Sequence, residues 1–454
     1  MTVAGQRAGS ILNIGVDRYV LRACQRHAAE TVALCGPEPW DFGPTVPDER
    51  VRILRVDDTS SPESVLGGLH RAGLADHGFD AVHTGEEWSL VTAGLVARSL
   101  GCRGIDPTVA LHFRDKFLQK LKVRDAGIAT ATSIVVDDIH DVDHLADLKF
   151  ERSVLKPLSY GGTGYTGVVS DFQELSAASA RWRARNLPQR TFVLEGFSTG
   201  DEWVADGVVF DGEVLFVALG KYGEPCLTSL SQQRALWVRR LDPDTESWAY
   251  ELAGPFVQAA ISALGLTNGI FHMEFFHDPD TGELTFGECA ARRGGGLTQE
   301  EVLYKFNVDL AECGVLSTLG IRPTLDIRVR PETVGHTHVL GRAGTLIGYP
   351  SVSEIRDLPD VEYARFEHPF GTQFPEGFEF IGQSLGLVLV SADSEAALAA
   401  RIGQLRAWID ERLVVARPHM TFREHRNWHE SHWPAEEVLG GRVYTPIQPN
   451  DGGY

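Results

Sequence analysis

The stretch GIFHMEFFHDPDTGELTFGECAARRGGG, residues 269–296, contains two apolar runs on either side of a strong turn signal. The runs are GIFHMEFFHD and ELTFGECA, and the DPDTG between them has the Asp, Pro and Gly of a tight turn. We therefore expect a β-hairpin. With the turn centred near residue 280 or 281, Glu274 and Glu288 are about equally far from it, so the two carboxylates are expected to face each other across the strand pair.

Two opposed carboxylates repel each other unless a cation lies between them, and a magnesium ion with oxygen ligands is the simplest candidate. The alternative is that both glutamates are solvated on an exposed face of the hairpin, as charged residues commonly are. The neighbouring side chains are mostly apolar, which weighs against an exposed face; they are Phe271, Met273, Phe275, Phe286 and Cys289.

The composition limits the chemistry that is available. The chain has 454 residues, of which 43% are hydrophobic and 23% are charged, as in a globular protein of roughly two to four domains. No run approaches the ~20 apolar residues of a membrane span, and the start MTVAGQRAGS lacks the pattern of a signal peptide. The six cysteines form no CxxC pair, which argues against a disulfide framework or a zinc ribbon. We expect a cytoplasmic protein with buried thiols.

The formal net charge of −20 opposes binding to the phosphates of nucleic acid and to anionic lipid. We therefore expect no nucleic-acid partner and no membrane partner. An anionic ligand would have to be held by local lysines, arginines and backbone amides beside glycine-rich turns.

The first part of the chain alternates apolar runs with amphipathic stretches. The runs ILNIG, TVALCG, VRILRV and DAVHTG are separated by stretches such as DRYVLRACQRHAAE and PESVLGGLHRAGLADHG. This βαβ rhythm predicts a doubly wound parallel-sheet domain over residues 1–110, and it contains no GxGxxG fingerprint. The glycines and the proline of GCRGIDPT then indicate a boundary, after which HFRDKFLQKLKVRDAG predicts a basic helix.

A second informative stretch is SVLKPLSYGGTGYTGVV. Two apolar strands, RSVLKP and TGVVSD, flank a loop rich in glycine, and Lys156 precedes that loop. No helix follows the glycines, so the stretch is not a Walker A phosphate loop. One interpretation is a lid whose amides point at phosphate oxygens while Lys156 reaches the same anion. The other is a flexible hairpin with a surface lysine.

The order of these parts resembles the ATP-grasp superfamily, and in particular its carboxylate–amine ligases. A lysine on a helix, a lysine before a glycine loop, an acidic hinge and two metal carboxylates followed by an arginine occur in that order within roughly residues 1–400. The resemblance implies an α/β and α+β protein. Its parts would be a pre-ATP-grasp domain (1–110), a small lobe with the lid (111–195), a large lobe with the metal site (196–325), and a C-terminal α+β cap and tail (326–454).

The resemblance also implies a set of ATP-binding positions, which are Lys116, Lys156, Gly161, Gly162, Gly164, Glu195, Phe197 and Glu202. The two lysines would meet the nucleotide phosphates beneath the glycine lid. The VLEGF segment would lie beside adenine, and the last glutamate would accept hydrogen bonds from the ribose hydroxyls. Each position also has an ordinary interpretation as a solvated helix or strand residue.

By the same resemblance, Glu274 and Glu288 would hold magnesium, and Arg292 would meet the transferred phosphoryl group or an acyl phosphate. One departure concerns Ala290, because the family usually has asparagine two positions after the second metal carboxylate. Three alternatives stay open: water fills that coordination position, the second metal binds weakly and turnover is poor, or Cys289 or His272 contributes. A thiol is a poor magnesium ligand, and a strand histidine is more often packed than ligating.

The C-terminal part resembles the small α+β cap of amino-acid ligases and carboxylases in this superfamily. No MKM-like biotin acceptor is present, which argues against a carboxylase that carries its own biotin domain. The tail HRNWHESHW places His425, His429 and His432 on one face of a possible helix. Without a carboxylate or cysteine ligand pattern, a solvated terminal helix is favoured over a metal site.

The function implied is an ATP-dependent ligase, with ATP and Mg²⁺ as cofactors, that joins small-molecule carboxylate and amine substrates into an amide through an acyl phosphate. One substrate would be an amino acid or a peptide, with Glu86, Glu87 and Arg293 as possible pocket residues, and a homodimer would be one state to expect. Two alternatives stay open: activation of bicarbonate, as in a biotin carboxylase, and a catalytically weak ATP-binding regulatory protein, suggested by Ala290.

Overall fold

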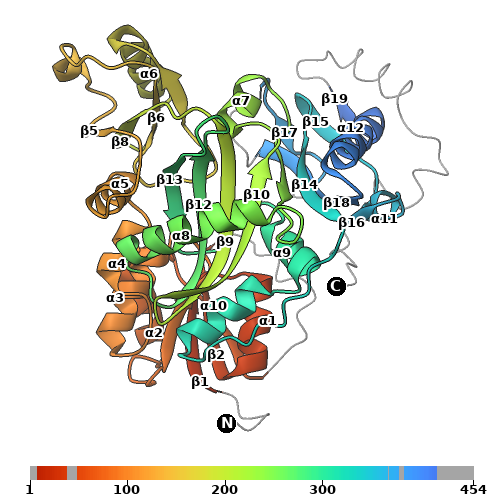
Figure 1. Cartoon of the computed structure of the whole chain (residues 1–454). Helices are drawn as coiled ribbons and strands as arrows, with labels where there is room; N and C mark the ends of the chain where they lie inside the picture. The colour runs from red at the N-terminus through yellow and green to blue at the C-terminus, as the bar shows by residue number, and fades with distance from the viewer. Residues whose placement is uncertain (1–7, 38–48, 367, 378–382, 417–454) are drawn as a thin grey trace. The chain divides into compact units, whose positions relative to one another are not determined.

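The computed structural model describes residues 8–37, 49–366, 368–377 and 383–416. The chain divides into two compact units, of which one contains residues 1–221 and 241–329 and the other contains residues 222–240 and 330–454 (Figure 1). The four-part division expected from the sequence is a finer one and stays a prediction.

The first unit begins with a parallel sheet in the order β3-β2-β1-β4, which confirms the predicted α/β domain. Its strands are β1 (Ala8–Ile14), β2 (Ala28–Cys35), β3 (Val51–Arg55) and β4 (Ala81–Thr84). The helices between them are α1 (Arg18–His27) and α2 (Pro62–Arg71), and α3 (Leu90–Leu100) follows. Both faces of the sheet are covered, because Leu12 packs with the α2–α3 side and Ile11 with the α1 side. A strand that is buried on both faces needs apolar side chains on both, which explains why the strand segments are apolar runs without polar residues at every second position.

The basic helix expected at 112–127 is α5 (Lys116–Asp125), and a separate helix, α4 (Pro107–His112), ends just before it. The break has a local cause, because the Asp115 carboxylate accepts hydrogen bonds from the backbone N–H groups of Phe117 and Leu118 and so caps α5. The cap makes Lys116 the first residue of its helix.

The glycine-rich stretch lies in a four-stranded antiparallel sheet of order β5-β8-β6-β7. The strands are β5 (Ser133–Val136), β6 (Ser153–Pro157), β7 (Gly167–Val169) and β8 (Phe192–Gly196), and the helix α6 (Phe172–Ala184) follows β7. β6 and β7 pair with Leu155 opposite Gly167, which confirms the predicted strand, glycine loop and return strand. A buried cluster that includes Leu155, Leu175 and Trp182 holds α6 against the sheet.

The large antiparallel sheet of the first unit has the order β13-β12-β9-β10. Its strands are β9 (Asp201–Phe210), β10 (Glu213–Tyr222), β12 (Gly269–His277) and β13 (Leu284–Ala290). One face is covered by α8 (Ser247–Leu264), which Figure 1 shows crossing the strands. The other face packs against α9 (Thr298–Phe306) and α10 (Leu310–Thr318).

The hairpin predicted at 269–290 is confirmed. β12 and β13 pair with Glu274 opposite Glu288 as expected, although the register shifts by one residue between Glu274 and Phe275. In the turn, the Asp278 carboxylate accepts hydrogen bonds from the N–H groups of Asp280 and Thr281, and Gly282 adopts a φ of 74°. These are the properties for which Asp and Gly are favoured in turns.

The second unit is α+β. Its larger sheet has the order β11-β14-β18-β16 and its smaller one the order β17-β15-β19. The strands are β11 (Trp237–Arg240), β14 (Thr333–Leu340), β15 (Gly344–Gly348), β16 (Val361–Phe366), β17 (Gln373–Phe374), β18 (Ser384–Ala392) and β19 (Val414–Ala416). The helices are α7 (Cys226–Ser231), α11 (Val352–Arg356) and α12 (Glu395–Arg412).

Three further expectations concern the tail histidines, the cysteines and membrane-spanning helices. His425, His429 and His432 lie outside the described residues, so their arrangement stays a prediction. All six cysteines are free thiols, of which Cys102 is half-buried and the others are buried. Among the described helices, none is both long enough and apolar enough to cross a membrane.

Candidate active site

Lysines from two parts of the first unit converge on the hairpin carboxylate Glu288. The Lys156 Nζ on β6 lies 3.3 Å from Glu288 Oε2, and the Lys116 Nζ at the start of α5 lies 3.4 Å from the same oxygen. The Lys156 Nζ also lies 3.0 Å from Glu195 Oε2 on β8. The structure therefore brings four of the predicted residues together around one point.

The charges in this cluster depend on one another. Burial by itself disfavours ionised Glu288, but the neighbouring Lys116 and Lys156 outweigh it and hold the pKa of this carboxyl well below its usual range. Burial likewise acts to lower the pKa of Lys156, yet Glu195 and Glu288 raise it. Glu288 is thus ionised and Lys156 is charged at neutral pH.

Helix α5 contributes two further residues that the sequence reasoning did not select. The Lys120 ammonium is buried, donates a hydrogen bond of 2.7 Å to the Gly287 carbonyl, and lies 3.4 Å from Glu195 Oε2. Burial lowers its pKa to about 8, against the effect of Glu195. The Gln119 side-chain amide forms two hydrogen bonds with the Cys289 backbone. Its Oε1 accepts from the Cys289 N–H at 2.9 Å, and its Nε2 donates to the Cys289 carbonyl at 2.7 Å. The spacing of Lys116 and Lys120 by four positions, which puts both on one helix face, was the available signal.

Arg292 is fixed by a carboxylate from the N-terminal part of the chain. Its Nε lies 2.9 Å from Glu87 Oε2, its Nη2 donates to the same oxygen, and the other Glu87 oxygen accepts from Arg114 Nη1 at 2.6 Å. Burial opposes ionisation of Glu87, but Arg292, Lys116 and Arg114 lower its pKa. Glu87 thus links the arginine after β13 to Arg114, two residues before α5.

The glycine-rich loop reaches this arginine. A Cβ atom at Gly161 would lie 3.6 Å from Glu87 Oε2 and 3.9 Å from Arg292 Nη2, so the loop backbone runs directly beside the Glu87–Arg292 pair. At Gly162 the φ of 66° suits glycine, and a Cβ at Gly164 would collide with the Tyr160 ring at 2.4 Å. The backbone conformation at Gly162 and the nearby Tyr160 ring at Gly164 therefore favour glycine at these two positions.

The neighbouring glutamate has a different environment. Glu86 accepts hydrogen bonds from Val16 N–H and Ser89 Oγ, both at 3.1 Å. Burial raises its pKa, the opposite direction to Glu87. Glu86 therefore fixes the loops after β1 and β4, while Glu87 serves the arginines.

Arg293 points to the loop after β1. Its guanidinium pairs with the Asp17 carboxylate and lies 5.3 Å from the centre of the Tyr19 ring. Arg292 bonds Glu87 in the loop after β4, and Arg293 pairs with Asp17 in the loop after β1. The segment after β13 therefore connects the hairpin to the loops that follow these two parallel strands. The residues suggested as pocket candidates, Glu86, Glu87 and Arg293, thus lie on loops that meet at this edge of the parallel sheet.

His272 occupies the position opposite Ala290 in the β12–β13 pair. Its Nδ1 lies 2.9 Å from Asp206 Oδ1, and its Nε2 lies 3.4 Å from Glu274 Oε1. Burial acts to lower its pKa, but Asp206 and Glu274 outweigh burial and raise the pKa to about 9. Asp206 is fully buried and also accepts the Gly294 N–H at 3.1 Å. A Cβ at Gly294 would lie 2.7 Å from His272 Nδ1 and 2.9 Å from Asp206 Oδ1, so only glycine allows this approach.

The residues assigned to the base and the ribose lie on or between β8 and β9, which follow each other in the chain but belong to different sheets. Glu195 is buried, and its Oε1 has no hydrogen-bond partner in the described part of the chain. The Phe197 ring has the Arg152 guanidinium 3.8 Å from its centre, and Glu202 is buried on β9. Their nucleotide-binding roles stay predictions.

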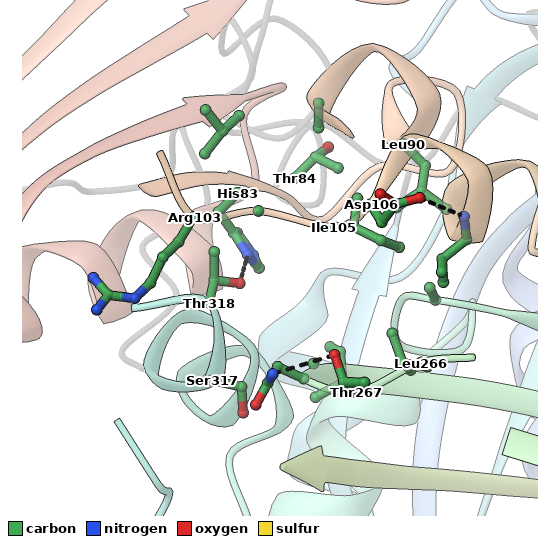
Figure 2. Close-up of a pocket in the computed structure, with 18 of the residues that line it drawn as sticks. His83, Thr84, Leu90, Arg103, Ile105, Asp106, Leu266, Thr267, Ser317 and Thr318 are labelled. Atoms are coloured by element: carbon green, nitrogen blue, oxygen red, sulfur yellow. Dashed lines mark hydrogen bonds between the residues drawn. The ribbon is translucent and has the colours of Figure 1, made fainter. Parts of the chain in front are cut away.

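A cavity of about 560 Å³ has Ala291, the residue before Arg292, in its lining but includes none of the predicted site residues. Figure 2 shows its wall around His83, which lies 2.9 Å from Thr318 Oγ1, while the Arg103 guanidinium points away from the other labelled side chains. Burial lowers the pKa of His83 to about 4, so its ring is neutral. The cluster of carboxylates, lysines and arginines has the chemistry to handle phosphates, whereas this cavity offers mostly neutral groups.

Comparison with known proteins gives one related enzyme and a set of similar folds. The L-arginine-specific L-amino acid ligase of Bacillus subtilis is 25% identical over 309 residues, which cover 67% of this chain and 73% of that protein. No protein-family profile matches the chain.

Among solved structures, an L-amino acid ligase from Bacillus licheniformis superposes with a TM-score of 0.72 at 20% identity, covering 91% of this chain and 100% of that one. A carboxyaminoimidazole ribonucleotide synthase from Aspergillus clavatus, in complex with ATP, superposes with a TM-score of 0.65 at 14% identity, covering 89% and 99%. These likenesses confirm the predicted α/β and α+β architecture.

Proposed function

We propose that this chain is an ATP-dependent carboxylate–amine ligase of the ATP-grasp superfamily, which joins the carboxylate of an amino acid or short peptide to the amine of a second such molecule. The observation that supports this most is the convergence of Lys116 and Lys156 on Glu288, which lies opposite Glu274. The related enzyme of B. subtilis is named for amino-acid substrates, and that name supports the substrate class.

The reaction requires the γ-phosphoryl group of ATP to move to the substrate carboxylate, giving an acyl phosphate and ADP. The amine then attacks the acyl carbon, forms the amide and releases phosphate. Lys116, Lys156 and Arg292 supply positive charge for the phosphoryl oxygens, in a site where positioning and electrostatics carry the catalysis. In the structure these cations are held by Glu288 and Glu87, so they are oriented before a nucleotide arrives.

The side chains fit a divalent cation that is shared with the nucleotide. Among the described residues, no three His, Cys, Asp or Glu side chains are grouped so as to hold a metal ion alone. Mg²⁺ typically uses one or two carboxylates together with phosphate oxygens and water, and Glu274 and Glu288 offer the carboxylates. When bound, Mg²⁺ would neutralise charge on the β- and γ-phosphates.

The substrate carboxylate and amine need recognition by groups outside this cluster. Arg293, Asp17 and Glu87 offer a cation and two carboxylates beside Arg292, which suits a substrate that carries both an ammonium and a carboxylate group.

The test is phosphate release from ATP and Mg²⁺ in the presence of pooled amino acids and short peptides, with mass spectrometry of each mixture. We expect release that depends on a pool, together with a product mass equal to the acid plus the amine less water. A matched pair of variants comes from one hairpin, where Glu288→Ala removes the carboxylate held by the lysines and Glu283→Ala changes an exposed glutamate at the turn.

The outcomes separate the candidate functions. Glu288→Ala should abolish ADP formation with little unfolding, while Glu283→Ala should retain it. Release that requires bicarbonate instead of an amine would identify bicarbonate activation. ATP binding without release in any pool would favour the regulatory alternative, and full activity of Glu288→Ala would show that the metal and phosphate assignment is wrong.

A further inference from the structure

Position 290 lacks the side-chain oxygen that the ATP-grasp resemblance leads one to expect, and the structure shows what lies opposite. His272 on β12 is the cross-strand partner of Ala290 on β13. His272 and Glu274 are two positions apart on one strand, so both side chains project from the same face. Alanine has no side-chain oxygen to offer at this position, whereas the imidazole opposite it has two ring nitrogens.

The imidazole is oriented as in metal-binding histidines. Its Nδ1 is fixed by the Asp206 carboxylate at 2.9 Å, and its Nε2 faces Glu274 Oε1 at 3.4 Å. Histidines that bind a metal through one ring nitrogen usually donate the other N–H to a carboxylate or carbonyl group. Asp206 is fully buried and also accepts the Gly294 N–H, so its own position is fixed from two sides.

The separation of the two candidate ligand atoms fits a shared cation. Two ligands that each lie about 2.1 Å from one ion, at right angles, are roughly 3 Å apart. The 3.4 Å between Nε2 and Oε1 is close to this value. Coordination needs a neutral ring, and a divalent cation beside Glu274 disfavours a proton on Nε2.

We propose that His272 Nε2 is a metal ligand in this chain, together with Glu274, and replaces the amide oxygen that Ala290 cannot supply. The inference rests on the proposed function, since it assumes the nucleotide-linked metal site. An imidazole nitrogen suits Mn²⁺ and later divalent metals better than it suits Mg²⁺, which prefers oxygen. The site is therefore one with a raised preference for Mn²⁺.

The test uses Mn²⁺ and ADP with the full-length protein, and it does not depend on turnover. Electron spin echo spectroscopy of bound Mn²⁺ detects the nuclear spin of a directly coordinated nitrogen. Protein labelled with ¹⁵N only in histidine should show a ¹⁵N coupling, which the adenine nitrogens cannot produce. The coupling should disappear in His272→Asn and in the second variant His272→Gln, while the wild-type measurement needs no variant to fold.

A competition experiment measures the metal preference. Mg²⁺ is titrated into the Mn²⁺–ADP complex, and the released Mn²⁺ is followed by its solution signal. We expect wild-type protein to need at least ten times more Mg²⁺ for half-displacement than the double variant His272→Gln/Ala290→Asn, which restores an amide oxygen at position 290.

The failure of the inference differs from the failure of the proposed function. If Mn²⁺ binds with ADP and binding is lost in Glu288→Ala, but no histidine coupling is seen, the His272 ligand is excluded and the metal site of the ligase stands. If Mn²⁺ does not bind with ADP although ADP itself binds, the assignment of Glu274 and Glu288 is wrong, and the His272 inference is overturned with it.

Discussion

At the scale of single residues, the local environment decides what a residue type does. Glu86 and Glu87 are adjacent, yet burial raises the pKa of Glu86 while three cations lower the pKa of Glu87. The glycines that follow Arg293 also differ in their surroundings. Gly294 approaches His272 and Asp206 closely, whereas a Cβ at Gly295 would meet nothing within 4 Å.

The two glycines give a matched pair of substitutions. Gly294→Ala would push a methyl group against His272, Asp206 and the Thr298 hydroxyl, so we expect a loss of about 1–3 kcal/mol of stability and at least a tenfold loss of ADP formation. Gly295→Ala should stay within about 0.5 kcal/mol of wild type. Thermal unfolding and the phosphate assay measure both. Equal behaviour of the two variants would contradict the close approach at Gly294.

At the scale of secondary-structure elements, α5 and β13 act as one support for the site. β13 is an edge strand of its sheet in the first unit, and an unpaired edge exposes backbone donors and acceptors. The Gln119 side chain forms hydrogen bonds with both the N–H and the carbonyl of Cys289, as a neighbouring strand would do. The same helix carries Lys116 and Lys120, so docking of α5 also sets the position of the two lysines.

Gln258 on α8 offers a control for Gln119. Its amide also bonds two backbone groups, the Val214 N–H at 2.9 Å and the Gly212 carbonyl at 3.0 Å, but at the turn between β9 and β10. Gln119→Met leaves the buried Cys289 groups unpaired and should cost about 2–4 kcal/mol of stability, with at least a fivefold weaker affinity for ADP. Gln258→Met should reduce stability less and leave the affinity unchanged. Calorimetry with ADP and thermal unfolding separate the two effects, and an unchanged ADP affinity in Gln119→Met would refute the role given to α5.

At the scale of the whole molecule, each unit contains a buried neutral histidine that makes stability depend on pH. Burial lowers the pKa of His83 to about 4 in the first unit and that of His338 to about 3 in the second. A histidine in the unfolded chain has a pKa of about 6.5 and takes up a proton at higher pH than either folded-state group. The stability from these neutral rings is therefore present above pH 6.5 and is lost as the pH falls toward the folded-state values.

The variant His83→Asn tests how much of the pH-dependent stability of the first unit comes from His83. Acidification from pH 7 to pH 4 should cost the wild type about 3 kcal/mol through His83, a contribution that the variant lacks. The variant should therefore show a smaller fall in the unfolding temperature of this unit. His70→Asn, at an exposed position on α2, should follow the wild type. The assignment fails if His83→Asn and His70→Asn respond to acid alike.

Several features of this protein follow from local sequence alone. The strands of the parallel sheet, the glycine loop between two strands and the 269–290 hairpin were all predicted. The pairing of Glu274 with Glu288 was expected too, but it also depends on a register shift between Glu274 and Phe275 that the turn does not reveal. Turn chemistry and the two-residue period of a strand act over a few residues, which is why they can be read without a structure. The break before Lys116 was missed because the Asp115 cap was overlooked as a helix start.

What only the tertiary structure decided is the set of partners from distant segments. Glu87 and Arg292 are separated by 205 positions and His272 and Asp206 by 66, and no pattern in the chain pairs them. Their meeting depends on how the parallel domain, α5 and the large sheet of the first unit pack together. The sequence by itself thus determined which charged residues were available and which strands carry them. Packing decided which cation neutralises which carboxylate, because electrostatic energy depends on distances that only the folded chain defines.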